Sequence, residues 1–321
     1  MKAVAWIKYG NPSDALGIME AETPVPKKNE VLIKVHSTAV TVGDARLRAS
    51  NVPVGFWVPT RLIFGLFKPR HKTPGMHFSG TVEGLGKEVE SFDIGDRVFG
   101  SSGMRFGANA EYMCLPETAA IIKKPDEIDH DDAVACIFGG QTAIHFLKNT
   151  AKLGPGQNIL VNGASGAVGT ASIQLAKYLG ADVTAVCSTE NIDLVKSLGA
   201  DKAIDYTGEN LEAGEETYDF ILDAVGNIPL SRGKNLLKEQ GKLISINVGL
   251  FATLSAAWNS KLIVGVARES KADLQFLKEL VMKGDFKPVI DRVYPLDKIA
   301  EAHEYVDRGH KKGNVVIAVA T

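Results

Sequence analysis

A glycine-rich turn at residues 163–169 restricts the fold of this chain more than any other feature. The sequence QNILVNGASGAVG at residues 157–169 passes from the apolar run 158–161 into a segment with helical apolar spacing. Small residues are needed where a pyrophosphate lies on the backbone N–H groups that open a helix. Ala164 replaces the first glycine of the usual GxGxxG pattern, but the strand–turn–helix context predicts a dinucleotide site. An ordinary strand-to-helix turn is the alternative.

Strand-like and helix-like segments alternate after about residue 124. The predicted strands are 158–161, 182–187, 202–205, 220–224, 242–246 and 262–266, and the predicted helices are 131–149, 169–179, 191–198 and 230–237. This alternation is typical of a doubly wound parallel sheet, so the fold class is α/β.

The two ends of the chain have a different character. Residues 1–123 are rich in predicted strands, including 2–7, 30–37 and 81–86, and a short tail of two helices (271–283 and 296–308) and two strands (287–293 and 314–319) ends the chain. A length of 321 residues leaves room for two domains.

Residues 51–73 are irregular, with three prolines and four aromatic residues. They predict either half-buried loop packing or one wall of an apolar substrate cleft.

Charge and cysteine content limit the partners and the compartment. Lys and Arg number 36 and Asp and Glu 38, so no global positive field favours nucleic acid. The short basic clusters 68–72 and 310–312 are expected to be solvated surface. Three widely spaced cysteines predict free thiols in a reducing cytoplasm. No apolar run approaches the ~18–20 residues of a membrane span, so no membrane partner is expected.

The end of the second strand of the dinucleotide unit indicates which dinucleotide binds. An Asp or Glu there accepts hydrogen bonds from a ribose 2′-hydroxyl and repels a 2′-phosphate. Strand 182–187 is followed instead by Ser188 and Thr189, and Asp182 lies at its opposite end. Two hydroxyls favour NADP(H), although Glu190 follows directly and leaves NAD(H) as the alternative.

Five stretches carry a resemblance to a known family. They are residues 73–80 (TPGMHFSG), 95–100 (GDRVFG), 108–113 (ANAEYM), 156–177 and 199–206 (GADKAIDY). Together they resemble the medium-chain dehydrogenase/reductase superfamily, in its zinc-independent NADPH:quinone oxidoreductase (zeta-crystallin-like) branch, over essentially the whole chain. Ala167 departs from the glycine that is usual in that branch.

The resemblance implies a domain organisation. Residues 1–123 and 267–321 would form a split GroES-like β-barrel catalytic domain, residues 124–266 a Rossmann domain, and the active site the cleft between them. It also implies a homodimer, with strand 262–266 a candidate pairing edge.

The resemblance allows a test for zinc. The positions that hold catalytic zinc in related alcohol dehydrogenases are Thr41, Met76 and Phe138 here, none of which is a plausible zinc ligand. The structural zinc lobe would fall near residues 98–115, which contain only Cys114. No zinc is therefore expected. Without a Lewis acid to stabilise an alkoxide, reduction of an activated acceptor is the easier chemistry.

The resemblance also assigns cofactor contacts. The pyrophosphate would lie on the turn, the 2′-phosphate at the ends of the next two strands, and the nicotinamide and riboses against later strand ends and the C-terminal return. The expected residues are Thr142, Ser165, Gly166, Ala167, Val168, Ser188, Thr189, Asn191, Tyr206, Val225, Asn247, Val248, Gly313, Asn314 and Val315.

Proton donors are less well specified. Thr41, Asp44, His77 and Tyr112 are catalytic candidates by residue type and rough location, and each has a structural alternative. Asp44, for example, could cap a helical turn at 45–49. A reduced quinone can also take its protons from water.

Three functions follow as hypotheses. The first is NADPH-dependent reduction of a small apolar quinone or enone. The second is reduction of the C=C bond of a 2-alkenal or enoyl substrate. The third, from another class, is non-catalytic binding of NADPH.

Overall fold

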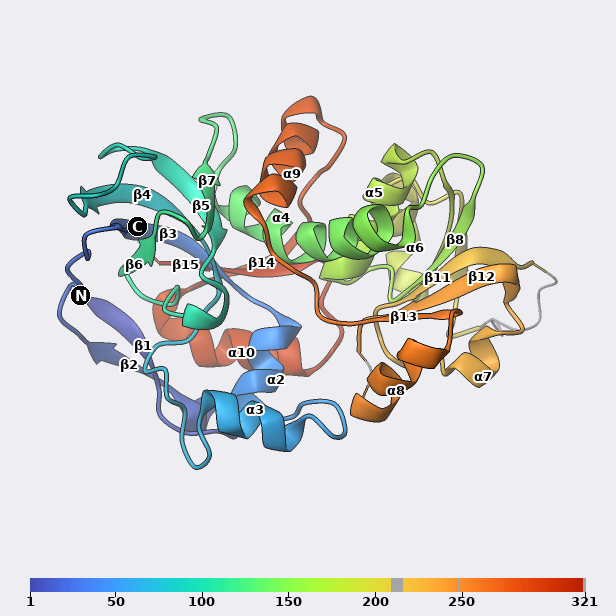
Figure 1. Cartoon of the computed structure of the whole chain (residues 1–321), viewed down its shortest axis with the longest axis horizontal. Coiled ribbons are helices and arrows are strands. Elements are labelled where there is room, and N and C mark those ends of the chain that lie inside the picture. Colours follow the sequence, from blue (N-terminus) through green and yellow to red (C-terminus); the bar gives the residue numbers. More distant parts are fainter. Residues whose placement is uncertain (209–215, 248, 320–321) are drawn as a thin grey trace. The chain divides into compact units, whose positions relative to one another are not determined.

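The computed structural model describes residues 1–208, 216–247 and 249–319, which form two compact units (Figure 1). The first unit contains residues 1–52, 57–138 and 269–321, and the second contains residues 53–56 and 139–268. The sequence placed the division at residues 123/124 and 266/267. The first unit extends further because the helix that begins at His130 packs on it until Phe138.

The second unit is built on a six-stranded parallel sheet. Its order is β10-β9-β8-β11-β12-β13, with β8 at the point where the order reverses. The strands are β8 (Asn158–Asn162), β9 (Asp182–Cys187), β10 (Lys202–Asp205), β11 (Tyr218–Asp223), β12 (Leu237–Ser245) and β13 (Leu262–Val264). The predicted doubly wound parallel sheet is therefore confirmed. Ligands bind such sheets outside the carboxyl ends of the strands, where the order reverses.

Helices connect these strands. They are α5 (Ala167–Tyr178), α6 (Ile192–Ser197), α7 (Leu230–Gly233) and α8 (Leu250–Ser255). Helix α4 (His130–Ala143), which continues as a π-helical segment to Ala151, precedes β8, and its residues up to Phe138 belong to the first unit. The predicted helix 230–237 is wrong beyond Gly233. Leu237 instead starts β12 and lies opposite Tyr218 in the parallel ladder. Both side chains are buried in one apolar cluster, and this tertiary burial outweighs the local helical pattern.

The first unit is built on a mostly antiparallel seven-stranded sheet. Its order is β14-β15-β3-β4-β5-β7, with β6 also paired to β3. The strands are β3 (Glu30–Val40), β4 (His77–Leu85), β5 (Arg97–Ser101), β6 (Tyr112–Pro116), β7 (Ala120–Lys123), β14 (Ile290–Pro295) and β15 (Asn314–Ala318), beside the separate pair β1 (Lys2–Trp6) and β2 (Leu16–Glu20). Because β15 pairs antiparallel with β3, the C-terminal tail completes the sheet that the N-terminal residues begin.

Five helices pack on this unit. They are α1 (Pro12–Ala15), α2 (Val42–Ala49), α3 (Trp57–Phe64), α9 (Lys271–Lys283) and α10 (Ile299–Asp307). The sequence predicted no regular element within residues 51–73, so the eight-residue α3 is a correction. Of the α3 residues only Phe64 is buried. The segment therefore lacks the repeated buried apolar positions, three or four residues apart, by which a core helix is usually predicted.

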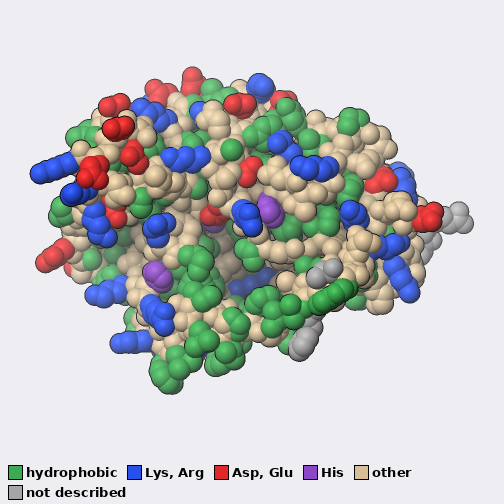
Figure 2. All heavy atoms as spheres, in the orientation of Figure 1, with side chains coloured by type: hydrophobic (Ala, Val, Ile, Leu, Met, Phe, Trp, Pro, Cys, Tyr) green, Lys and Arg blue, Asp and Glu red, His purple; other side chains and the backbone are tan. Residues whose placement is uncertain are grey.

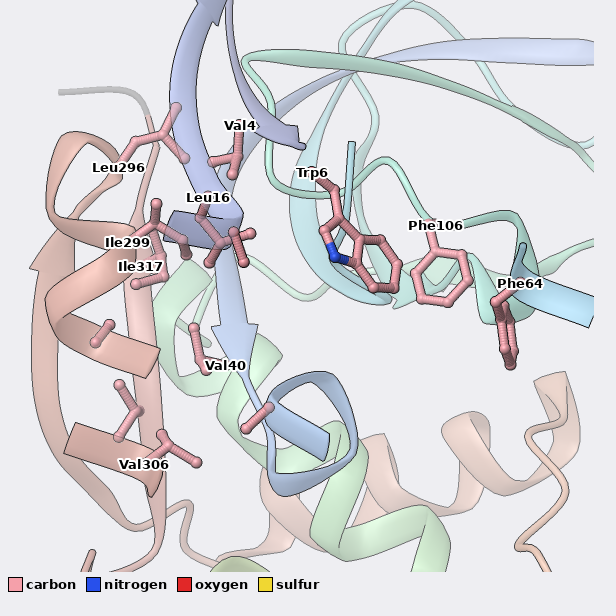
Figure 3. Close-up of a cluster of buried hydrophobic side chains, with 14 residues drawn as sticks. Val4, Trp6, Leu16, Val40, Phe64, Phe106, Leu296, Ile299, Val306 and Ile317 are labelled. Carbon is pink, nitrogen blue, oxygen red and sulfur yellow. The ribbon is translucent and has the colours of Figure 1, made fainter. Parts of the chain in front are cut away.

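A core cluster joins the two ends of the chain in the first unit (Figure 3). Val4 and Val40 pack with Ile299 and Ile317 from the C-terminal tail. At one side of the cluster the Phe106 ring makes edge contacts with Trp6 and Phe64, at centroid distances of 5.9 and 5.6 Å.

Candidate functional site

The turn between β8 and α5 has the backbone that an anion site requires. Gly163 has φ +78°, and Gly166 is the N-cap of α5 with φ −77°. Because Gly166 has no side chain, none caps the first-turn N–H groups of Ala167 and Val168. A helix N-terminus of this kind presents N–H groups and the positive end of the helix dipole to a phosphate.

Two positions of this turn are occupied by glycine for different reasons. A Cβ on Gly169 would lie 2.2 Å from the Gly163 carbonyl oxygen, so backbone packing alone requires glycine there. A Cβ on Gly166 would meet only that same oxygen, at an ordinary 3.5 Å. Beyond its neighbours in the chain, no other atom of the described residues lies within 4 Å of such a Cβ, as expected of a position that a ligand approaches.

A buried polar network fixes the neighbouring strand ends. Asn162 donates from Nδ2 to Asp223 Oδ1 at 2.8 Å, and Asp223 accepts from the backbone N–H groups of Val225 and Gly226. Asn247 then donates to the Val225 carbonyl at 3.0 Å. The predicted contacts Val225 and Asn247 therefore lie side by side, and Val225 also adjoins Gly163.

The residues predicted to surround a 2′-phosphate lie together at the ends of β9 and β10. Asn191 donates to Ser188 Oγ at 2.9 Å, and the Tyr206 N–H donates to the Cys187 carbonyl at 3.1 Å. The Tyr206 side chain is exposed. Ser188, Thr189, Asn191 and Tyr206 thus form one group.

Asp205 is a member of this group that the sequence reasoning missed. Thr189 donates to its Oδ2 at 2.5 Å, and Thr207 donates to its Oδ1 at 2.6 Å. These hydrogen bonds lower the pKa of Asp205, which keeps it ionised. The signal was available, because Asp205 ends a predicted strand next to the one that carries Ser188.

The remaining predicted cofactor contacts are distributed over both units. Thr142 is buried on α4 in the second unit. Asn314 and Val315 begin β15 in the first unit, directly after Gly313, and Asn314 Nδ2 donates to the Val289 carbonyl. The Val315 side chain is fully buried in the core cluster, so it packs rather than faces a ligand. The prediction for Val248 lies outside the described residues.

A partly buried ion pair lies in the first unit. His77, at the start of β4, is 1% exposed, and its Nε2 lies 2.8 Å from Glu269 Oε1. Ser101 on β5 donates to the other oxygen of the same carboxylate. Burial alone would lower the pKa of His77, but the charge and hydrogen bond of Glu269 outweigh it and raise that pKa. Burial would raise the pKa of Glu269, but the charge and hydrogen bond of His77 outweigh that effect and lower it.

Thr41 and Asp44 form a capping box beside this pair. Thr41 is the N-cap of α2, and its hydroxyl both donates to Asp44 Oδ2 at 2.6 Å and accepts from the Asp44 N–H. The expected helical turn at 45–49 therefore starts earlier, and Asp44 is its third residue rather than its cap. Burial raises the pKa of Asp44, and the nearby charge of His77 opposes that shift.

Two buried atoms here have no hydrogen-bond partner among the residues that the structure describes. They are Asp44 Oδ1 and His77 Nδ1. Such atoms are costly unless they meet a ligand or water, so they mark a candidate for chemistry. We call Thr41, Asp44, His77, Ser101 and Glu269 the His77 cluster.

Tyr112 does not belong to the His77 cluster. It lies on β6 opposite Lys34, several residues along β3 from Thr41, and its pKa is raised by burial and by Glu83. The sequence chose Tyr112 by residue type within a family-like stretch, and that pattern carries no information about which strand end it occupies.

Comparisons with known proteins agree over the full chain. Residues 27–126 match the alcohol dehydrogenase GroES-like domain, and residues 198–317 match the zinc-binding dehydrogenase domain. The chloroplast envelope quinone oxidoreductase homolog of Arabidopsis thaliana is 32% identical over 99% of this chain and 98% of its own. The chain belongs to the quinone oxidoreductase family of the medium-chain dehydrogenase/reductases.

Further members of this superfamily extend the comparison. The NADPH-dependent alkenal/one oxidoreductase of Arabidopsis thaliana is 32% identical over 99% of this chain and 79% of its own. The solved quinone oxidoreductase of Coxiella burnetii superposes with a TM-score of 0.89 at 30% identity, covering 100% of this chain and 99% of its own. The predicted pairing of a GroES-like domain with a Rossmann-type sheet is therefore confirmed.

The positions that hold zinc in related dehydrogenases carry unsuitable side chains in this family member. Thr41 is committed to the capping box, and the Phe138 ring lies against His77 at a centroid distance of 5.8 Å. Within the described residues, no three His, Cys, Asp or Glu side chains are placed to hold a metal ion.

Glu269 was missed by the sequence reasoning because it stands 192 residues from His77 in a stretch without a motif.

Proposed function

We propose that this protein catalyses NADPH-dependent reduction of a quinone or a similar conjugated acceptor. The observation that carries the proposal is the uncapped, open Gly166 turn in a chain that matches quinone oxidoreductases from end to end. Bound NADPH supplies the hydride, and the acceptor spreads the resulting negative charge over its own conjugated system.

Each part of the chain then has a defined task. The N–H groups of Ala167 and Val168 hold the pyrophosphate, and Ser188 and Thr189 hold the 2′-phosphate. Val225 and Asn247, fixed by Asp223, support the adjacent ribose. These contacts orient the cofactor, and orientation supplies most of the catalysis for hydride transfer between two π-systems.

The reaction proceeds without zinc in this proposal. Thr41, Met76 and Phe138 offer a committed hydroxyl, a soft thioether and a ring where related enzymes place metal ligands. An acceptor that delocalises its own charge needs no Lewis acid.

Among the four catalytic candidates, His77 is the best placed to donate a proton. Glu269 keeps His77 protonated towards higher pH, which raises the share of histidine that can act as an acid. His77 Nδ1 is the atom without a protein partner, so it is the atom from which the proton leaves. Water is the alternative donor.

The protein is proposed to act as a cytoplasmic homodimer. β13 is the edge strand of the parallel sheet, which leaves its outer side available for pairing with a second copy. Burial raises the pKa of the Cys114 and Cys136 thiols to about 11 and about 12, so both stay protonated and unreactive, as suits a reducing compartment. Sedimentation velocity of the purified chain tests the dimer.

Steady-state oxidation of NADPH, compared with NADH, tests the function with an ortho-quinone and a 2-alkenal as parallel acceptors. Quinone turnover that survives a metal chelator supports the proposal. Faster turnover of the 2-alkenal favours C=C reduction, the alternative that the alkenal/one oxidoreductase relative suggests. Tight NADPH binding without turnover of either acceptor would identify a non-catalytic binding protein.

A further inference from the structure

Helix α3 and the turn after it present a row of large apolar side chains to solvent. Their exposed fractions lie between 46% and 86%, with Phe67 the highest; the residues are Trp57, Val58, Leu62, Ile63, Leu66 and Phe67. Figure 2 shows hydrophobic side chains gathered along the lower edge of this face, where Figure 1 draws α3, with Lys or Arg side chains beside them. We call these six residues the α3 patch.

The α3 patch is held firmly in this exposed position. Phe64, the last residue of the helix, is buried against Phe106 in the core cluster (Figure 3). Arg61 stacks over the Tyr9 ring at 3.9 Å, and the Tyr9 hydroxyl donates to the Gly65 carbonyl at 3.0 Å. Because these contacts hold the C-terminal half of the helix in place, the apolar patch is a feature of the fold and not of a loosely packed loop.

A basic cluster lies directly beside this patch. The Arg70 N–H donates to the Phe64 carbonyl at 2.8 Å, so the chain folds back on the end of α3. Lys68, Arg70 and Lys72 are exposed, and the whole segment 45–82 contains no Asp or Glu. In a chain with net charge −2, this segment is a local concentration of positive charge.

We propose that the α3 patch and its basic cluster dock on the surface of an anionic phospholipid bilayer. Apolar side chains that enter the boundary between headgroups and acyl chains supply one contribution, and Lys or Arg beside anionic lipids supplies the second. Reversible attachment to a membrane surface generally needs two such signals together. The interaction goes beyond the proposed function, because it needs neither NADPH nor an acceptor.

The sequence-based expectation of no membrane partner rested on the missing span. No helix in the described part of the chain combines the length and apolarity needed to cross a bilayer. A helix that lies in the interface needs neither, only one apolar face and neighbouring positive charge.

Charge favours a lipid surface over a second copy of the chain. A two-fold symmetric contact would place the α3 patch against itself and bring two basic clusters together without a compensating carboxylate from segment 45–82. An anionic bilayer supplies the opposite charge over the same area.

Co-sedimentation with phosphatidylcholine vesicles, with and without phosphatidylglycerol, tests the proposal on the purified full chain. We expect binding only to the anionic vesicles, with release at about 0.5 M NaCl. Neutralising Lys68, Arg70 and Lys72 to Gln should weaken binding about five-fold for each charge removed. Phe67→Ser should weaken it at least about ten-fold.

Matched variants separate this surface from general effects. Ile94→Ser removes an exposed apolar side chain elsewhere, and neutralising the exposed Lys234, Lys242 and Lys283 removes the same charge elsewhere. Both should bind anionic vesicles like the parent chain. Thermal unfolding of every variant shows whether the fold is intact.

Three results would overturn the proposal. The first is that the parent chain does not bind anionic vesicles at low salt, or that the variants of the patch bind these vesicles as well as the control variants do. The second is loss of a dimer in Phe67→Ser by sedimentation velocity without vesicles, which would assign the patch to a second copy. The third is a higher KM for a water-soluble quinone in Phe67→Ser with vesicle binding unchanged, which would assign it to the acceptor site. Because vesicle binding is measured without turnover, its failure is distinct from failure of the proposed function.

Discussion

His77 Nε2 and Glu269 Oε1 lie 2.8 Å apart, although 192 residues separate them in the sequence. His77 begins a strand of the first unit, and Glu269 stands where the chain re-enters that unit from the second. Each partner shifts the pKa of the other in the direction of its charged form. The pair therefore joins two distant parts of the chain beside Asp44.

Replacing Glu269 with Gln should make stability depend differently on pH. The raised His77 pKa contributes stability that is complete below the unfolded pKa and lost as pH rises through the folded pKa. The lowered Glu269 pKa contributes stability above its unfolded pKa that is lost as pH falls through the folded pKa. The cost of Glu269→Gln should thus be about 1–3 kcal/mol near pH 6 and smaller near pH 9, measured by urea unfolding.

Glu88→Gln is the matched control for that measurement. Glu88 pairs with Lys28 at 3.3 Å, and both side chains are largely exposed. A solvent-exposed pair of this kind contributes about 0–1 kcal/mol, so its removal should have a small effect at every pH. An equal cost of Glu269→Gln at both pH values would show that the carboxylate does not hold a proton on His77.

The same substitution should move the pH profile of turnover. If His77 donates the proton, kcat for the quinone falls on the alkaline side as His77 loses its charge. Without the Glu269 carboxylate, burial dominates and lowers the His77 pKa, so this alkaline limb should move to lower pH in Glu269→Gln. An unchanged profile with a lower Tm would reduce Glu269 to a structural role and leave water as the donor.

Alanine should affect stability at one glycine of the turn and NADPH affinity at another. Gly169→Ala forces a Cβ to 2.2 Å from the Gly163 carbonyl, so it should lower Tm before any cofactor is added. Gly166→Ala meets no close atom and has an ordinary negative φ, so its Tm should stay near that of the parent. Its Kd for NADPH should nonetheless rise about ten-fold or more, because the methyl group occupies the space of the pyrophosphate. Unchanged NADPH affinity in Gly166→Ala, measured by fluorescence titration, would place the cofactor elsewhere.

The sequence predicted the parallel sheet well because its signals are local. Apolar runs, helical spacing and the 163–169 turn are each readable within a few residues. Long-range features were harder to predict. Glu269 lies in no motif. Leu237 was predicted to be helical, but it forms part of a strand because its side chain is buried beside Tyr218. Tyr112 was chosen by residue type and rough location, and only the β3–β6 register reveals that it lies apart from His77.

Asp205 leads to a prediction about coenzyme preference. It accepts from Thr189, which is proposed to hold the 2′-phosphate, so its negative charge opposes that phosphate. Asp205→Asn keeps an acceptor for Thr189 and removes the charge, which should raise the ratio of kcat/KM for NADPH over NADH by about 3- to 10-fold. Asp182→Asn, at the opposite end of β9, is the matched control and should leave the ratio unchanged. Higher ionic strength should shrink the effect of Asp205→Asn, since the Asp205 carboxylate is partly exposed to solvent. If Asp205→Asn and Asp182→Asn give the same ratio as the parent, the 2′ position of the adenosine ribose does not lie at the ends of β9 and β10, and Ser188 and Thr189 lose their proposed role with it.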